Sequence, residues 1–240
     1  MEIMAVISKK IFVLALMYMM LITSSLAQDS SYVKGIDVSH NNGNIDWSQV
    51  SQQGIQFAFI KATEGIGWQD PQFKDNKDNI DSAQKAGLKV GAYHYARPDS
   101  GNDASAEAKW FVQVARDYIK PGYLPPALDI EWDHSNVESK SPSYLANWIN
   151  TWMSTVKDLT GVEPIIYTHH YYVEQCMKGQ ASLADYDIWM ADTSDPAPDL
   201  AGIWSKWTFW QYKIGSVSGI TGDVDLDYFN GDYSGLSNYV

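Results

Sequence analysis

The sequence of 240 residues contains a single cysteine, Cys176. One cysteine cannot form a disulfide within the chain, so the stability of the fold has to come from packing. Aromatic residues suit that role, and the sequence has 10 tryptophans and 15 tyrosines. Cys176 lies in a helix-like stretch and lacks the pattern of a partnered histidine, so we expect it to be buried.

Motifs for metals and nucleotides are also missing. The five histidines show no paired-ligand spacing of the H-E-x-x-H kind, so we expect no metal ion and no other cofactor. No glycine-rich phosphate loop follows the first predicted strand, which argues against a doubly wound nucleotide-binding sheet. We expect one of the histidines, His94, to form a hydrogen bond behind the predicted strands.

Positive charge is scarce. The sequence has 17 Lys and Arg against 29 Asp and Glu, a formal net charge of −12. Such an acidic surface argues against nucleic acid and against an anionic membrane as partners.

The first 27 residues have the pattern of a secretory signal peptide. Lys9 and Lys10 precede an apolar run over residues 11–22, and residues 25–27 offer small side chains at the two positions that define cleavage. The run is short for a membrane span, although an uncleaved anchor is the alternative. We expect a single domain over residues 28–240, with no membrane association after cleavage. Its expected location is extracellular or a lysosome-like digestive compartment, and its expected state a monomer.

Apolar strand patterns alternate with helical patterns along the rest of the chain. This alternation predicts an α/β fold with parallel strands joined by right-handed crossovers. We interpret it as an irregular barrel of eight strands and about five helices, with a full set of helices on one side only. The predicted strands are 34–40, 56–63, 88–95, 126–132, 163–168, 186–192, 207–212 and 223–229, and the predicted helices are 46–53, 71–86, 103–118, 142–160 and, less clearly, 170–184.

Polar residues lie at the predicted carboxyl end of nearly every strand. In a closed parallel barrel those ends surround one mouth, where barrel enzymes carry their chemistry. The residues are Asp37, Lys61, Glu64, Tyr93, Tyr95, Asp129, Glu131, Tyr167, Asp192, Gln211 and Asp225.

The pair Asp129 and Glu131 is the most suggestive of these. Residues i and i+2 of a strand project to the same side, with Cα atoms roughly 6.6 Å apart at ~3.3 Å per residue. Two carboxyls in reach of one bond can take different pKa values and act as acid and base on a glycosidic bond. A strand that ends in solvated acids is the alternative reading of the same pattern.

Seven motifs, read in order, resemble those of the family 25 glycoside hydrolases, which are single-domain lysozymes that cleave peptidoglycan as N-acetylmuramidases. The resemblance covers about residues 35–229 and implies an irregular TIM-like β/α barrel. The motifs are G-I-D-V-S-H (35–40), I-K-A-T-E-G (60–65), G-A-Y-H-Y (91–95), L-D-I-E (128–131), P-I-I-Y-T (164–168), W-Q-Y (210–212) and G-D-V-D-L-D-Y-F (222–229).

The resemblance also implies roles for the acids. Glu131 corresponds to the general acid, and burial beside a second carboxylate should raise its pKa. Asp129 should stay ionised, either as a nucleophile or as a group that orients the 2-acetamido group of the substrate; we favour the second, with net retention of configuration. Asp37 and Asp225 match two further acids that stabilise positive charge. Asp223 and Asp227 share the strand face of Asp225, but the family motif favours Asp225.

Aromatic residues near the mouth are candidates for sugar contacts, because the C–H faces of sugars pack on aromatic rings. Ordinary core packing is the alternative for each of them. The candidates are Tyr93, Tyr95, Tyr167, Trp132 and Trp210, with Gln211 and, more weakly, Asp192 as polar contacts. Lys61 and Glu64 either pair across the mouth or contact the substrate.

The expected function is that of a secreted lysozyme that hydrolyses the β-1,4 bond between N-acetylmuramic acid and N-acetylglucosamine, with peptidoglycan as its partner. Another N-acetylhexosamine polymer such as chitin is an alternative substrate. An inactive sugar-binding lectin is the alternative of a different class, and the presence of all four acids argues against it.

Overall fold

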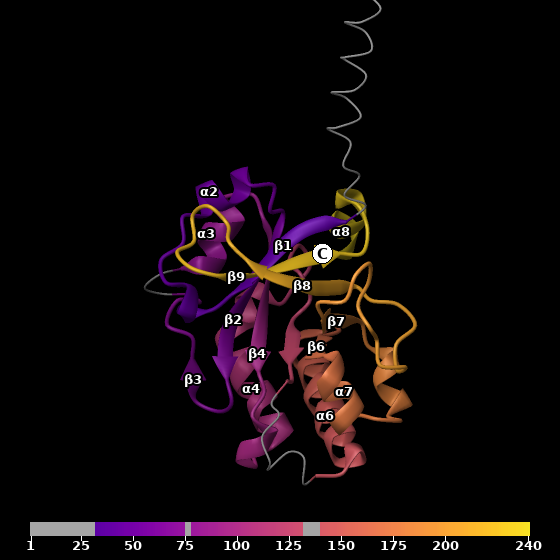
Figure 1. The fold of residues 1–240 in the computed structure, drawn as a ribbon. Helices are drawn as coiled ribbons and strands as arrows, with labels where there is room; N and C mark the ends of the chain where they lie inside the picture. Colours follow the sequence, from indigo (N-terminus) through magenta and orange to yellow (C-terminus); the bar gives the residue numbers. More distant parts are fainter. Residues whose placement is uncertain (1–31, 75–77, 132–139) are drawn as a thin grey trace, which may run out of the picture. The chain divides into compact units, whose positions relative to one another are not determined.

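Eight strands close into a barrel in the computed structural model, which describes residues 32–74, 78–131 and 140–240 (Figure 1). They are β1 (Val33–Val38), β2 (Phe57–Glu64), β4 (Lys89–Tyr95), β5 (Ala127–Asp129), β6 (Ile165–His169), β7 (Ile188–Ala191), β8 (Phe209–Gly215) and β9 (Val224–Phe229). From β1 to β8 neighbouring strands are parallel, and β9 pairs antiparallel with both β8 and β1 to close the ring. A short strand, β3 (Trp68–Gln69), pairs with the end of β2 outside the ring. The predicted single barrel domain of eight strands is confirmed.

The direction of β9 corrects the sequence-based expectation of an all-parallel barrel. A parallel return needs a crossover of a dozen or more residues. Only residues 216–223 separate β8 from β9, so the chain can only turn back on itself. This reversal places the amino end of β9, rather than its carboxyl end, at the mouth of the barrel.

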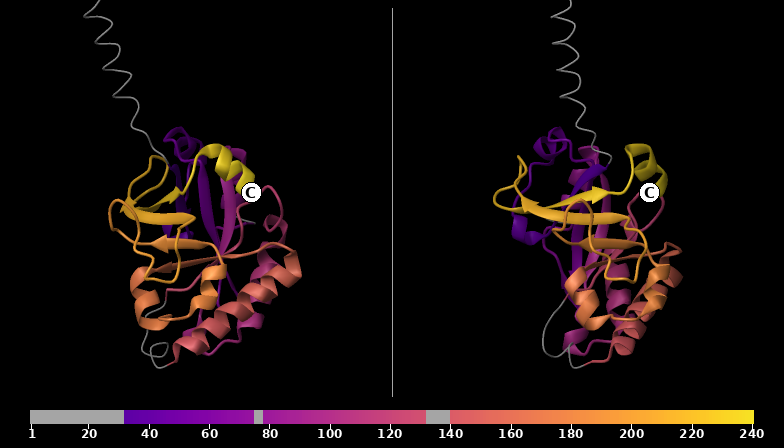
Figure 2. Two further views of the ribbon diagram at one scale, coloured as in Figure 1. Left: turned by 90° about the vertical axis from the view of Figure 1, so that its right-hand side faces the viewer. Right: turned by 45° about the vertical axis from the view of Figure 1, so that its right-hand side comes forward.

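Helices cover the barrel unevenly. The α-helices of the described residues are α2 (Trp47–Gln52), α3 (Asn79–Lys85), α4 (Ala104–Ala115), α6 (Pro142–Thr160), α7 (His170–Cys176) and α8 (Tyr233–Tyr239), of which α8 was not predicted. In Figure 1, α4, α6 and α7 lie together beside β4, β6 and β7. Residues 192–208 and 216–223, all of them described, contain no helix, which leaves β8 and β9 less covered (Figure 2).

Local sequence signals explain where several helices begin and end. Asp46 accepts the backbone N–H of Gln49 at the start of α2, and Ser141 caps α6 in the same way, both as predicted. Gly161 ends α6 at φ 78°, a left-handed conformation that glycine adopts without strain. Residues 75–77 lie outside the described part of the chain, and the predicted helix 71–86 is wrong over residues 71–74. There the Asp70 carboxylate accepts the backbone N–H of Gln72 and stabilises a turn, and the helix begins only at Asn79.

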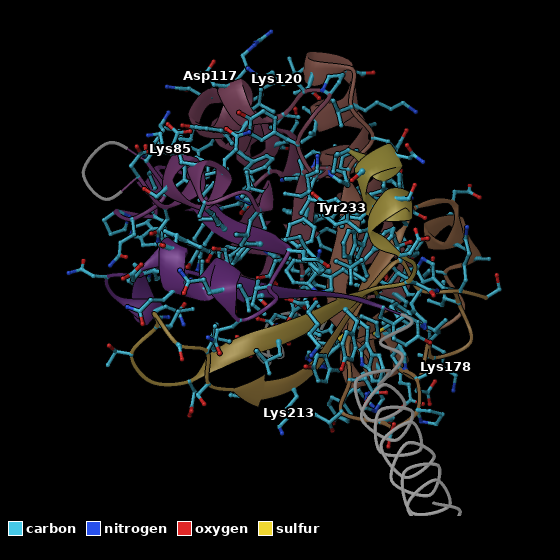
Figure 3. All side chains as sticks on the ribbon, turned by 90° about the horizontal axis from the view of Figure 1, so that it is seen from above. Lys85, Asp117, Lys120, Lys178, Lys213 and Tyr233 are labelled. Atoms are coloured by element: carbon cyan, nitrogen blue, oxygen red, sulfur yellow. The ribbon has the colours of Figure 1, made fainter. Side chains whose placement is uncertain are left out.

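Apolar side chains fill the barrel and the layer behind it. Phe57, Phe59 and Phe209 pack inside the ring with Trp189, which stacks on Phe59 at 4.4 Å between ring centroids. The approach is so close at Gly35 that an added Cβ would lie 2.3 Å from the Phe57 ring. These apolar side chains fill the barrel interior away from its mouth, and the polar groups lie at the mouth. Seen from above, side chains crowd the interior, and exposed charged residues lie toward the outside (Figure 3).

The predictions for two buried residues are confirmed. His94 is fully buried behind the barrel wall, with Nδ1 2.8 Å from Thr63 Oγ1 and Nε2 2.9 Å from Glu107 Oε2. Burial lowers the pKa of His94 even though Glu107 acts to raise it, so the imidazole is neutral at neutral pH. Cys176 is buried in the outer layer. Within the described ranges, no helix has the length and apolar character needed to cross a membrane.

Candidate active site

A pocket of ≈ 360 Å³ opens at the mouth of the barrel and brings together most of the predicted site residues. Two larger hollows, of ≈ 690 and ≈ 490 Å³, lie elsewhere and are lined by none of those residues. We therefore take the mouth pocket as the candidate site in spite of its smaller volume. It is lined by Asp37, Ser39, Asn41, Lys61, Tyr93, Tyr95, Asp129, Glu131, Tyr167, Trp189, Gln211 and Asp225.

Asp129 and Glu131 both line the pocket, although β5 is shorter than predicted and ends at Asp129. The pairing continues for one more residue, because the Ile130 N–H donates to the Tyr167 carbonyl at 2.9 Å. Thr168 Oγ1 also donates to the Ile130 carbonyl at 2.6 Å. Ile130 is fully buried in the outer layer, so the residues on either side of it face the pocket. The Glu131 side chain thus faces the same side as Asp129, as predicted, although it lies beyond the end of β5.

The two carboxyls of this pair have different surroundings. Asp129 is only 5% exposed, and its Oδ1 accepts no hydrogen bond from the described residues. Burial, followed by the charge of Glu131, raises the pKa of Asp129 well above its ordinary value, while Lys61 opposes the rise. Glu131 is half-buried, and its Oε2 lies 3.4 Å from the Tyr167 hydroxyl. Burial thus acts against the ionised form expected for Asp129, and that expectation stays a prediction.

Lys61 is the one cationic side chain among the described residues that line the pocket. Its Nζ donates to Glu64 Oε2 at 2.8 Å and lies 4.4 Å from the centre of the Tyr95 ring. Glu64 also accepts a hydrogen bond from Arg97 at 3.0 Å and does not itself line the pocket. Partial burial acts to raise the pKa of Glu64, but Lys61 and Arg97 lower it overall. Lys61 and Glu64 are therefore paired, and Lys61 also borders the pocket, where a contact with the substrate stays a prediction.

Asp37 and Asp225 approach from neighbouring strands and are Cα partners in the pairing of β1 with β9. Asp37 Oδ2 accepts a hydrogen bond from Gln211 Nε2 at 2.8 Å, and Gln211 Oε1 accepts one from the Tyr167 hydroxyl at 3.0 Å. Burial and then the charge of Asp225 raise the pKa of Asp37 well above its ordinary value, and burial raises that of Asp225. Asp225 is the second residue of β9, so its predicted place at a carboxyl strand end is wrong. Only the antiparallel direction of β9 brings it to the mouth.

Besides Glu64, two of the predicted contacts do not reach the pocket. Trp210 follows the inward-facing Phe209, so its side chain is buried in the outer layer, and its indole N–H donates to the Asp192 carbonyl at 2.6 Å. The Asp192 carboxylate accepts the backbone N–H groups of Ser194 and Asp199 and so stabilises the loop that follows β7. Trp132 lies outside the described residues.

The sequence reasoning missed Trp189 and gave no role to Asp227. The Trp189 ring lines the pocket, and its indole N–H donates to Asp227 Oδ1 at 2.8 Å. A signal for Trp189 was present, because it alternates with the outward-facing Ile188 and Met190 in a predicted strand. The described residues contain no group of three or more His, Cys, Asp or Glu that is placed to hold a metal ion.

Comparison with known proteins decides the family. The sequence pattern of glycosyl hydrolases family 25 matches residues 36–220, well over half of the chain. The chain belongs to family 25 of the glycoside hydrolases. This family 25 protein is 37% identical over 215 residues to Lysozyme M1 of Streptomyces globisporus, an alignment that covers 87% of this chain and 71% of the relative.

Solved structures agree with this assignment. The bacterial lysozyme from Streptomyces coelicolor is 36% identical to this family 25 protein, with a TM-score of 0.80 over 88% of this chain and 100% of the other. The muramidase from Trichobolus zukalii is 31% identical, with a TM-score of 0.76 over 86% of this chain and 98% of the other. The resemblance seen in the motifs is thus confirmed over the whole barrel. The protein is a glycoside hydrolase of the lysozyme and N-acetylmuramidase family.

Proposed function

We propose that this protein is a secreted lysozyme that hydrolyses the β-1,4 bond between N-acetylmuramic acid and N-acetylglucosamine in peptidoglycan. The observation that carries the proposal is the mouth pocket, which is lined by Glu131, Asp129, Asp37 and Asp225. Relatives described as lysozymes and muramidases share this barrel at 31–37% identity, which supports the same substrate class for this chain.

In this proposal Glu131 is the general acid that protonates the leaving glycosidic oxygen. It is half-buried at the mouth, where a sugar can reach it, and it lies 3.4 Å from the Tyr167 hydroxyl. That hydroxyl has a single proton, and its shorter contact, 3.0 Å, is to Gln211 Oε1. The Tyr167 oxygen is therefore an acceptor that can hold a protonated Glu131 carboxyl in place until a glycosidic oxygen replaces it.

Asp129 sits deeper and acts on the substrate's 2-acetamido group. An acetamido N–H that donates to the Asp129 carboxylate lowers the pKa of this acid, against the effect of burial, when the sugar enters. The acetamido oxygen then attacks the anomeric carbon as the leaving group departs, and water opens the resulting ring, so the configuration is retained. Asp37 and Asp225 stabilise the positive charge that develops on the sugar ring.

The direct test is mass analysis of the soluble fragments that purified peptidoglycan releases with wild-type protein and with Glu131→Gln. The proposal expects fragments with reducing-end muramic acid from the wild type, and loss of nearly all release in the variant, which keeps the shape of the side chain but has no transferable proton. Glu174→Gln is the matched control, since Glu174 is exposed on α7 away from the pocket. Full activity of Glu131→Gln would move the general acid elsewhere.

Further measurements address the finer parts of the proposal. An NMR time course in which the inverted anomer appears first would reject retention. Equal release from chitin and from peptidoglycan would reject the narrower substrate class. Amino-terminal sequencing of protein from the medium tests secretion, with Gln28 as the expected first residue.

A further inference from the structure

Asp227 is a fully buried carboxyl directly below the site, with no role in the reaction as proposed so far. It lies two residues after Asp225 on β9, so both side chains project toward the barrel interior. Its Oδ1 accepts the Trp189 indole N–H at 2.8 Å, while its Oδ2 has no N–H donor among the described residues. A buried carboxylate oxygen without a donor is costly, so some other group has to satisfy it.

The group best placed to reach Asp227 is the carboxyl of Asp37. Asp37 pairs with Asp225 and Gly35 pairs with Asp227, so Asp227 lies diagonally across the β1–β9 pair from Asp37, on the same face of the sheet. The pKa of each acid is shifted by the other, and a hydrogen bond between two carboxyls requires that one of them carries a proton. Asp37 borders the pocket and already accepts the Gln211 amide N–H at 2.8 Å, which favours its charged form. Asp227 has no exposed surface, and the charged groups that face it, Asp37 and Asp225, are both acids. The shared proton therefore belongs on Asp227.

We propose that Asp227 is a positioning residue that stays protonated and donates a hydrogen bond to the Asp37 carboxylate, so that Asp37 is held ionised and correctly directed beneath the bound sugar. The inference rests on the proposed function of the site. Burial, then the charge of Asp37, raises the pKa of Asp227 well above its ordinary value, in agreement with this assignment. The contact with Asp227 in turn lowers the pKa of Asp37 against the effect of burial.

The arrangement gives Asp37 two donors. Gln211 donates from β8 and Asp227 from β9, and the Trp189 indole on β7 holds Asp227 in place. Through Gln211 and Tyr167 the same chain of hydrogen bonds continues to Glu131. Asp227 thus acts through Asp37 and does not line the pocket itself.

Two substitutions of Asp227 test whether this residue acts as a protonated hydrogen-bond donor or as a negatively charged carboxylate. Asp227→Asn keeps a donor toward Asp37, so we expect kcat/KM to fall no more than about threefold. Asp227→Leu removes the donor, and the loss of one hydrogen bond to a charged group predicts a fall of about 10- to 100-fold. Without its donor Asp37 ionises at higher pH, so the acid limb of the kcat/KM profile moves to higher pH in Asp227→Leu and stays in place in Asp227→Asn. The position of this limb, unlike the size of kcat/KM, does not depend on how much of the protein is active, as long as melting temperatures show the variants folded over the whole pH series.

A spectroscopic measurement tests the protonation of Asp227 independently of enzymatic activity. The infrared difference spectrum between wild type and Asp227→Asn at neutral pH should contain the carbonyl band of one buried protonated carboxyl. Asp187→Asn, at a half-buried acid bonded to Tyr239 outside the site, should leave both this band and the activity unchanged. Absence of the band, or a loss in Asp227→Asn as large as in Asp227→Leu, would overturn the inference. A wild type that shows the band but releases no fragments from peptidoglycan would instead overturn the proposed function.

Discussion

Gln211 offers the sharpest test of how the site controls its acids. Its Nε2 donates to Asp37 Oδ2 at 2.8 Å, and its Oε1 accepts from the Tyr167 hydroxyl at 3.0 Å. An ionised Asp37 has only acceptors, so the amide nitrogen has to face it. Gln211→Met keeps the length and approximate shape of the side chain and removes both hydrogen bonds.

The structure sets the size of the expected effect. A hydrogen bond to a charged group is worth about 1.5–3 kcal/mol, and about 1.4 kcal/mol corresponds to a factor of ten, so kcat/KM should fall about 10- to 100-fold. Burial and the charge of Asp225 already raise the pKa of Asp37, and the Gln211 contact opposes that rise. Loss of the contact raises this pKa further. Activity that needs ionised Asp37 appears as the pH rises through its pKa, so the acid limb of the profile should shift to higher pH.

The assay is the initial rate at which purified peptidoglycan releases soluble fragments, measured over a pH series. Gln113→Met is the matched control, because Gln113 lies on the exposed face of α4. Melting temperatures of both variants establish that they are folded. If folded Gln211→Met kept the wild-type kcat/KM and the wild-type acid limb, Asp37 would not depend on this donor, and the reasoning would fail.

Two further predictions concern stability. Glu107 accepts hydrogen bonds from His94 Nε2, the Arg97 N–H and Asn102 Nδ2, so Glu107→Ala strands three donors and should cost about 3–5 kcal/mol, or roughly 10 °C in melting temperature. A melting temperature within about 2 °C of wild type would contradict this. Because the pKa of Asp129 is raised, the folded state binds the proton of this carboxyl more tightly than the unfolded state does. The stability that the group contributes is therefore present at low pH and is lost as the pH rises through the folded-state pKa. Asp129→Asn should therefore melt higher than wild type at pH 8, with no gain below the ordinary pKa of 3.8, and an equal gain at both pH values would refute this origin.

Much of the fold was predictable because it depends on local signals. Strands and helices differ in the spacing of their apolar residues, so their alternation can be read along the chain. Capping residues such as Asp46 and Ser141 mark where helices begin. The error in the predicted helix 71–86 occurred where a contact distant in sequence outweighed local preference. The Asp70 carboxylate accepts the backbone N–H of His40 as well as that of Gln72, and so holds a turn where a helix was predicted.

For the site, the sequence determined which residue types stand near strand ends, including the pair Asp129 and Glu131 and the acids Asp37 and Asp225. Strand alternation also fixed which neighbours face the same side, as it does for Asp225 and Asp227. Alternation along one strand cannot say which side is the barrel interior, so Trp210 was expected in the pocket although Trp189 lines it.

Only the tertiary structure decided how the acids meet. The antiparallel direction of β9 places Asp225 opposite Asp37, and ring closure buries Asp227 beneath them. The protonation of these carboxyls depends on burial and on charges from other strands, which act through space and not along the chain. The acids Asp37, Asp129, Glu131 and Asp225 could therefore be predicted from the sequence alone. Which of the acids carry protons depends on the tertiary structure, because closure of the barrel buries them and brings them together.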